Sequence, residues 1–148
     1  MAIKWKTKRF EALSVIELYE ILKLRSEVFV MEQNCIYQDI DGKDDKALHL
    51  FGFFNGDIVA YARLFKSGDY FDNAAIGRVV VAQKYRNQKW GHDLISGSIA
   101  GIQECFGETQ ITISAQLYLK AFYEQNGFTQ TSETYLEDGI PHIEMWRH

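Results

Sequence analysis

The chain has 148 residues, of which 47% are hydrophobic, 14% aromatic and 24% charged, and its formal net charge is −4. This length fits a single domain, residues 1–148, with a buried core. The acidic balance argues against nucleic acid as a partner, because neutralising phosphates requires clustered lysines and arginines. No apolar run reaches the roughly 18 residues of a membrane span, and residues 1–6 lack a signal-peptide core. The two cysteines show no CxxC spacing. We therefore expect a soluble protein of the reducing cytoplasm, with no membrane partner.

The first third of the chain predicts a strand, a helix and a loop. Residues 2–10 alternate weakly and indicate a strand. Ser14 and Glu17 have the spacing of a capping box, and apolar residues behind them keep a helical period, which predicts a helix over 14–31. Residues 34–46 are polar and irregular and predict a loop.

The middle of the chain predicts three strands. Two apolar and aromatic runs, 48–54 and 58–65, are joined by an Asn-Gly pair, which is a strong signal for a β-hairpin. The chain turns again at 67–69, and residues 75–82 read as one continuous strand with three consecutive valines.

The last third predicts two helices and three strands. Residues 91–106 keep a helical period, 109–115 is a β-branched strand, and a helix over 117–126 ends with Gly127 at C′. Two further strands, 129–137 and 140–147, are joined by an Asp-Gly turn. The order β-α-β-β-β-α-β-α-β-β indicates a mixed α+β sheet with helices on its faces.

A basic turn between a strand and a helix is the first candidate binding site. The first N–H groups of a helix have no partner inside it and favour anions, and successive N–H groups of a turn can form an anion-binding nest. Arg86 and Lys89 add positive charge, and Gly91 allows a close approach of the backbone. A solvated surface turn with incidental basic residues explains the pattern equally well.

The segment from Arg86 to Gly91 resembles the phosphate loop of the GNAT acetyltransferases, Arg/Gln-x-x-Gly-x-Gly/Ala, with Lys89 in place of the first glycine. The resemblance implies that the turn holds the pyrophosphate of acetyl-CoA and that the preceding strand pairs with the pantetheine amides. The implied cofactor-binding residues are Val79, Val80, Val81, Arg86, Asn87, Gln88, Lys89, Trp90, Gly91, His92 and Gln116.

A second segment, residues 116–128, resembles the GNAT signature Asn-x-x-Ala-x-x-aromatic-Tyr-x-x-x-Gly-Phe. Four positions match it, and Gln116 and Leu119 replace the usual Asn and Ala. Transfer from a thioester expels a thiolate, and a tyrosine of pKa near 10 can protonate this leaving group. An isolated tyrosine would be an ordinary half-buried residue, but the two motifs in order favour Tyr123 as the general acid.

Most of the chain is similar to the ElaA-like branch of the GNAT family. The stretches that carry this resemblance are 24–41, 59–63, 76–79 and 137–143. It implies a GNAT fold, with a mostly antiparallel central sheet flanked by helices, and N-acetyl transfer from acetyl-CoA to a small-molecule or peptide amine. No metal is expected, because the histidines show no metal-ligand spacing. We expect direct transfer, with a backbone N–H near Val79–Val81 stabilising the oxyanion.

The acceptor side is less clearly marked. In the fold that the chain resembles, candidate substrate-binding residues are Arg25, Tyr37, Arg63 and Arg78. A mid-strand arginine such as Arg63 or Arg78 must pair with something. An internal ion pair with Glu27, Glu32 or Asp39 is favoured over a substrate carboxylate held in a bidentate fork. For the general base, His142 comes first and Glu32 second, and a water chain is equally compatible.

The remaining polar residues predict structural roles. Residues 39–45 superficially resemble a calcium loop, but the glycine comes too early for an EF-hand, so an acidic solvated loop is expected. The four histidines show no metal-ligand spacing, and His49 reads as a structural histidine at a strand edge. Cys105 is expected in the core, and for Cys35 a structural role is favoured over a reactive thiol.

Two rival functions remain open. A protein with this fold could bind CoA as a sensor or interaction module without catalysis. Arg25-x-x-Val28-Phe29 also resembles the start of the acyl-homoserine-lactone synthases, although these lack the second motif. A homodimer is compatible with the sequence, but no pattern in it supports one.

Overall fold

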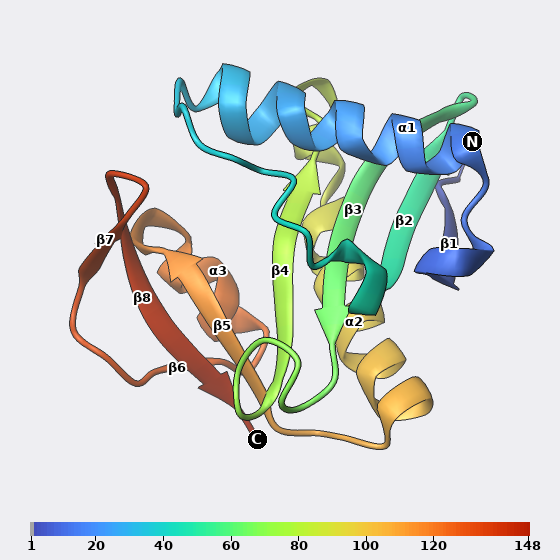
Figure 1. Cartoon of the computed structure of the whole chain (residues 1–148). Coiled ribbons are helices and arrows are strands. Elements are labelled where there is room, and N and C mark those ends of the chain that lie inside the picture. The colour runs from blue at the N-terminus through green and yellow to red at the C-terminus, as the bar shows by residue number, and fades with distance from the viewer. Residues whose placement is uncertain (1) are drawn as a thin grey trace.

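The computed structural model describes residues 2–148, which form one mixed sheet with helices on both faces (Figure 1). The strands follow the order β1-β2-β3-β4-β5-β8-β6, with β7 also paired to β8, and every pairing is antiparallel except β4 with β5. Their bounds are β1 Lys4–Arg9, β2 Leu48–Phe54, β3 Asp57–Phe65, β4 Ala74–Val81, β5 Ile111–Gln116, β6 Thr129–Gln130, β7 Tyr135–Glu137 and β8 Ile140–Arg147. The predicted mixed α+β class is confirmed.

The helices are α1 (Val15–Arg25), α2 (Trp90–Phe106) and α3 (Lys120–Gln125). The predicted capping box opens α1: the Ser14 hydroxyl accepts from the Glu17 N–H, and the Glu17 carboxylate accepts from the Ser14 N–H. The helical path continues from α1 through a π-helical turn, Ser26–Glu32. It thus ends one residue beyond the predicted boundary.

Strand alternation divides the core between two faces of the sheet. Leu50 and Ala62 point toward α2 and belong to the larger apolar cluster. Phe51 and Tyr61, one position along each strand, pack with Ile21 of α1 in the smaller cluster. In Figure 1, α1 crosses the near face of β2 and β3 while α2 runs behind them. Polar residues of β2 and β3 that lie two positions along the strand from Phe51 or Tyr61 point to the same face, toward α1.

Strand β4 is not the continuous strand that its valines predicted. Arg78 has φ +51°, and the pairing with β3 shifts so that two β4 residues stand opposite one residue of β3. This is a β-bulge. A positive φ is uncommon for a residue with a side chain, so the neighbourhood of Arg78 must hold it there.

The region after α3 also differs from the prediction. Gly127 follows α3 with φ +91° and its N–H donates to Glu124, which confirms it as the residue that ends the helix. The expected strand over 129–137 is instead two short strands, β6 and β7, with irregular chain between them. Both pair with β8, so the sheet has one strand more than the sequence order indicated.

Two smaller expectations were wrong. Cys105 lies on an exposed part of α2 and not in the core, because α2 turns this position away from the sheet. His49 does not lie at an edge: its strand, β2, is paired on both sides, and the ring is fully buried.

The parallel pair β4 and β5 positions the candidate site. They pair only at Ala74 with Ile111 and at Ala75 with Thr112, and beyond these residues the two strands diverge, as Figure 1 shows. Beyond this point the two strands are not paired with each other, and residues of both line the cavity described below.

Candidate active site

A cavity of about 400 Å³ occupies the space between the diverging strands. Its walls are β4 from Ile76 to Val81 and β5 from Ile113 to Gln116, and side chains of the π-helical turn, α3 and the β7–β8 hairpin complete it. Of the predicted cofactor residues, those that line it are Val79, Val80, Val81, Arg86, Gly91 and Gln116.

The candidate phosphate turn, residues 86–91, lies at one end of this cleft. A 3₁₀ segment, Gln83–Gln88, is followed by Lys89 in the left-handed conformation, with φ +62°, and α2 then begins at Trp90. A Cβ at Gly91 would come within 3.4 Å of the Phe122 ring. The N-terminus of α2 thus borders the cleft where an anion would be stabilised by the unpaired N–H groups and the helix dipole.

Other side chains of the turn point elsewhere. The ring of Trp90 packs against Phe54 and Tyr85, with centroids 5.1 and 5.5 Å away, so a contribution of Trp90 to ligand binding would come from its backbone. The cavity is not lined by the side chains of Asn87, Gln88, Lys89, Trp90 or His92.

Arg86 and Glu32 are joined across the mouth of the cleft. The guanidinium donates through both terminal nitrogens to the two carboxylate oxygens, with Nη2 2.8 Å from Oε1, and through Nε to the Val81 carbonyl. Glu32, the second candidate base, is therefore held by an arginine. Next to this pair, the amides of Gln33 and Gln116 exchange hydrogen bonds of 3.1 and 3.2 Å.

Tyr123 enters the cleft from α3. Only 6% of its surface is exposed, and it packs edge-on against Phe122 and Phe128. Burial raises the pKa of Tyr123 above its ordinary value. The hydroxyl is therefore protonated throughout the neutral pH range, as a proton donor must be.

His142 lies in the same cleft with a defined tautomer. Its Nδ1 is 2.7 Å from the Ile140 carbonyl oxygen, and because a carbonyl only accepts, Nδ1 carries the proton. In the neutral ring Nε2 is then the basic nitrogen, 3.4 Å from Oε2 of Glu137. The ring stacks on Tyr135, with centroids 6.2 Å apart.

The predicted substrate-binding residue Arg25 is not accessible. It is fully buried and donates to the Asp39 carboxylate at 2.9 Å and to Asp44 at 2.7 Å. The ion pairs and hydrogen bonds with these aspartates raise the pKa of Arg25 against the opposing effect of burial. The expectation of a substrate contact is thus corrected: this guanidinium already has its carboxylate partners inside the protein.

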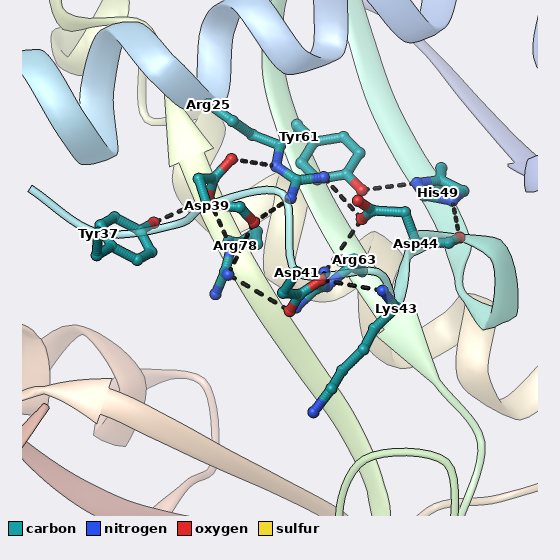
Figure 2. A network of polar contacts seen from close by, with 10 residues as sticks. All are labelled: Arg25, Tyr37, Asp39, Asp41, Lys43, Asp44, His49, Tyr61, Arg63 and Arg78. Atoms are coloured by element: carbon teal, nitrogen blue, oxygen red, sulfur yellow. Dashed lines mark hydrogen bonds and ion pairs between the residues drawn. The ribbon is translucent and has the colours of Figure 1, made fainter. Parts of the chain in front are cut away.

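Arg63 and Arg78 belong to the same network, which Figure 2 shows around the loop before β2. Arg63 binds both carboxylate oxygens of Asp41, at 2.8 and 2.9 Å, and also reaches Asp44. The Nε of Arg78 lies 2.7 Å from Asp39 and its Nη2 donates to the Asp39 carbonyl. Internal ion pairs are therefore present, as favoured, but their partners are loop aspartates, of which only Asp39 was named.

The loop containing Asp39, Asp41 and Asp44 is correspondingly not the solvated acidic loop that was expected. Three carboxylates and three guanidiniums neutralise one another, and Asp39 and Asp44 are buried. Burial alone would raise the pKa of Asp41, but its bonds to Arg63 hold it at about 2. The network holds the loop against the α1 face of the sheet and helps fix the bulge at Arg78.

Tyr37 is the predicted substrate-side residue that remains at the cleft together with Arg78. Its hydroxyl donates to Asp39 at 2.8 Å, and the guanidinium of Arg78 lies over its ring at 5.6 Å. Both side chains line the cavity. They can shape the acceptor side, although the charge of Arg78 is already paired.

Sequence reasoning missed two polar residues of the cleft, Ser114 and Glu137. Ser114 of β5 lies 2.6 Å from the Tyr135 hydroxyl and donates to Glu137 at 3.1 Å. The sequence did contain one indication of Glu137, because this residue begins a stretch, 137–143, that resembles the ElaA-like branch. No role was predicted for its carboxylate.

Within residues 2–148, no three His, Cys, Asp or Glu side chains are grouped so that they could hold a metal ion. In the same part of the chain, no helix is long and apolar enough to cross a membrane.

Comparisons with known proteins identify the family. The acetyltransferase (GNAT) domain matches residues 14–147. Protein ElaA of Escherichia coli K12 is 43% identical over 147 residues, covering 98% of this chain and 96% of ElaA, and its crystal structure has a TM-score of 0.93 at 99% and 100% coverage.

Two further structures agree. An acyl-CoA N-acyltransferase from Pseudomonas aeruginosa is 39% identical with a TM-score of 0.94, covering 99% of this chain and all of that one. The PaiA N-acetyltransferase of Thermoplasma acidophilum, solved in complex with coenzyme A, shares the fold at 17% identity, with a TM-score of 0.71 and 99% of both chains covered. The chain therefore belongs to the GNAT acetyltransferase family, in its ElaA-like branch.

Proposed function

We propose that the protein is an N-acetyltransferase that moves the acetyl group of acetyl-CoA directly to an amine, carried by a small molecule or a peptide. The observation that carries the proposal is the cleft between β4 and β5, which has a helix N-terminus at one end and a buried tyrosine in its wall. The coenzyme A complex of PaiA, which has the same fold, supports this reading of the cleft.

The residues around the cleft suggest how the cosubstrate is held. The turn 86–91 and the N-terminus of α2 would bind the pyrophosphate through backbone N–H groups. The free edge of β4 from Val79 to Val81 would pair with the pantetheine amides, as an added strand would. A backbone N–H beside the bulge at Arg78 would donate to the thioester oxygen as negative charge develops there.

The chemical step needs a base and an acid. An acceptor that arrives as an ammonium first loses one proton to water. The lone pair of the neutral amine then forms the new C–N bond to the acetyl carbon, and the nitrogen gives its second proton to Nε2 of His142. The C–S bond breaks, and its electron pair leaves on the thiolate, which takes the proton of the Tyr123 hydroxyl. No protein nucleophile takes part, and the thiol of Cys35 is buried and directed at the Asp138 carbonyl, 3.3 Å away.

The proposal is tested by incubating the protein with acetyl-CoA and a panel of amines. The released CoA thiol is measured, and the products are identified by mass spectrometry. Amine-dependent thiol release and an acetylated amine would support it. Tight acetyl-CoA binding without thiol release for any amine would favour the sensor alternative. Acyl transfer that requires S-adenosylmethionine would favour the acyl-homoserine-lactone-synthase alternative.

A further inference from the structure

The charges around the cleft are unevenly balanced. Its two arginines already have carboxylate partners: Arg86 is paired with Glu32, and Arg78 with Asp39. Glu137 also lines the cavity, but within residues 2–148 no lysine or arginine nitrogen lies within 4 Å of its carboxylate. Its side chain is 48% exposed, so a solute can reach it. With a neutral His142 ring, the uncompensated charge of this part of the cleft is therefore negative.

Glu137 stands at the end of the cleft away from the phosphate turn. A smaller cavity of about 60 Å³ adjoins the main one, and both are lined by Gly77, Arg78, Ser114 and Glu137. Gly77 lies in the first half of β4, whereas the phosphate turn follows the last residue of that strand. This position suits the acceptor, which must approach the thioester from the side opposite the phosphates.

The Glu137 carboxylate is held in a fixed place. Glu137 pairs with Ile140 in the β7–β8 hairpin, and its Oε1 accepts a hydrogen bond from Ser114 of β5. The other oxygen, Oε2, faces Nε2 of His142 at 3.4 Å. Because the Ile140 carbonyl requires the proton on Nδ1, the neutral ring offers Nε2 as an acceptor. When the ring is neutral, two acceptors thus face each other, and a group with several N–H donors would satisfy both.

We infer that Glu137 and His142 form the binding site for the ammonium group of the acceptor. An alkylammonium donates one N–H to Oε2 of Glu137 and another to Nε2 of His142, and such charge-assisted bonds are the strong ones. A carboxylate next to the amine would be repelled by Glu137. The acceptor is therefore a primary alkylammonium without a neighbouring carboxylate, on a small amine or on a lysine side chain. This inference rests on the proposed amine acetylation and names its substrate class.

Direct binding to the CoA-loaded protein tests the inference separately from catalysis. The probes are n-pentylamine, norleucine, which adds a carboxylate beside the amine, and Nα-acetyl-lysine amide, with dissociation constants measured by NMR titration at pH 7. The variants are Glu137→Gln and, as a matched control, Glu133→Gln, an exposed residue of the same segment that does not line the cleft.

Wild type should bind n-pentylamine at least about tenfold more tightly than norleucine, and Glu137→Gln should lose about tenfold in n-pentylamine affinity and most of the preference. The control should stay within about twofold, and both variants should keep their CoA affinity. Tighter binding of the lysine amide than of n-pentylamine would point to a peptide source, and weaker binding to a small amine.

Equal n-pentylamine affinity in Glu137→Gln and wild type, or no binding to wild type, would overturn the inference. Alkylammonium binding without any thiol release would instead count against the proposed acetyl transfer and leave the ammonium site intact. Acetylation of an arylamine or hydroxyl that is insensitive to Glu137→Gln would overturn the ammonium site alone.

Discussion

The carboxylate of Glu32 and the guanidinium of Arg86 bind each other through two hydrogen bonds, and this ion pair joins the end of the first helical segment to the turn before α2. Both oxygens of Glu32 are occupied, so it is a positioning residue for Arg86 and is poorly placed to accept a proton from an amine. Glu32→Gln should therefore change the KM for acetyl-CoA while kcat stays within about threefold.

Steady-state kinetics with varied acetyl-CoA, repeated across pH, checks this prediction. A general base lost from the reaction would lower kcat by about a hundredfold or more. A loss of that size in Glu32→Gln, with acetyl-CoA binding unchanged, would return the role of base to Glu32.

Tyr123→Phe removes the proposed acid while keeping the ring that packs on Phe122 and Phe128. Turnover should fall about a hundredfold, and the dissociation constant for CoA should stay within about twofold, because the hydroxyl acts only on the departing thiolate. Single-turnover kinetics and calorimetry separate the two effects. An unchanged rate from pH 6 to pH 9 would exclude Tyr123 as the acid.

Asp44 is the carboxylate shared by Arg25 and Arg63, at 2.7 and 3.1 Å. Asp44→Asn keeps the shape but leaves two buried guanidiniums with less compensating charge, and should lower the free energy of unfolding by about 3 kcal/mol. Urea denaturation measures the loss. The matched control is Asp45→Asn, an exposed neighbour expected to stay within about 0.5 kcal/mol. Equal effects of the two variants would mean that the network contributes little to stability.

The same network should make the fold sensitive to acid. The pKa of Asp41 is about 2 in the folded chain against an ordinary 3.8. As the pH falls, the unfolded chain therefore takes up this proton at a higher pH than the folded chain does. The stabilising effect of Asp41 is full above about pH 4 and lost as the pH falls through 2. The loss amounts to about 1 to 2 kcal/mol after allowance for solvent screening of a partly exposed pair.

Burial also lowers the pKa of His49, whose ordinary value is 6.5. The folded ring, bonded to Tyr61 and to the Asp44 carbonyl, resists a proton that the unfolded chain accepts. Stability should therefore begin to fall as the pH drops below about 6.5. Urea titrations from pH 7 to 2 should show both steps, and the upper one should be absent in His49→Gln. A free energy of unfolding that stays constant over this pH range would contradict the lowered pKa values of both Asp41 and His49.

The elements set by local chemistry were predictable from the sequence. The capping box of α1, the Asn-Gly hairpin and the glycine after α3 each depend on residues within a few positions of one another, and the structure has all of them. The turn 86–91 and Tyr123 could be singled out as candidates because both motifs are contiguous in the chain.

The features that the sequence did not reveal depend on distant partners. The bulge at Arg78 requires a positive φ that the valine run conceals, and it is accompanied by ion pairs with a loop almost forty residues earlier. The aspartates of that loop looked solvated because their arginines lie on α1, β3 and β4. Glu137 gained its place only when the hairpin brought it beside Ser114 and His142.

Calorimetry of acetyl-CoA binding is the most direct test of the central claim, that the cleft ending at the turn 86–91 holds the cosubstrate. Wild type should be compared with an Arg86→Ala, Lys89→Ala double variant and with Lys84→Ala, which removes one charge from the same 3₁₀ segment outside the cleft. We expect micromolar binding by wild type and Lys84→Ala, and a loss of about tenfold or more in the double variant. Absence of binding by wild type, or equal binding by all three proteins, would contradict this account of the cleft.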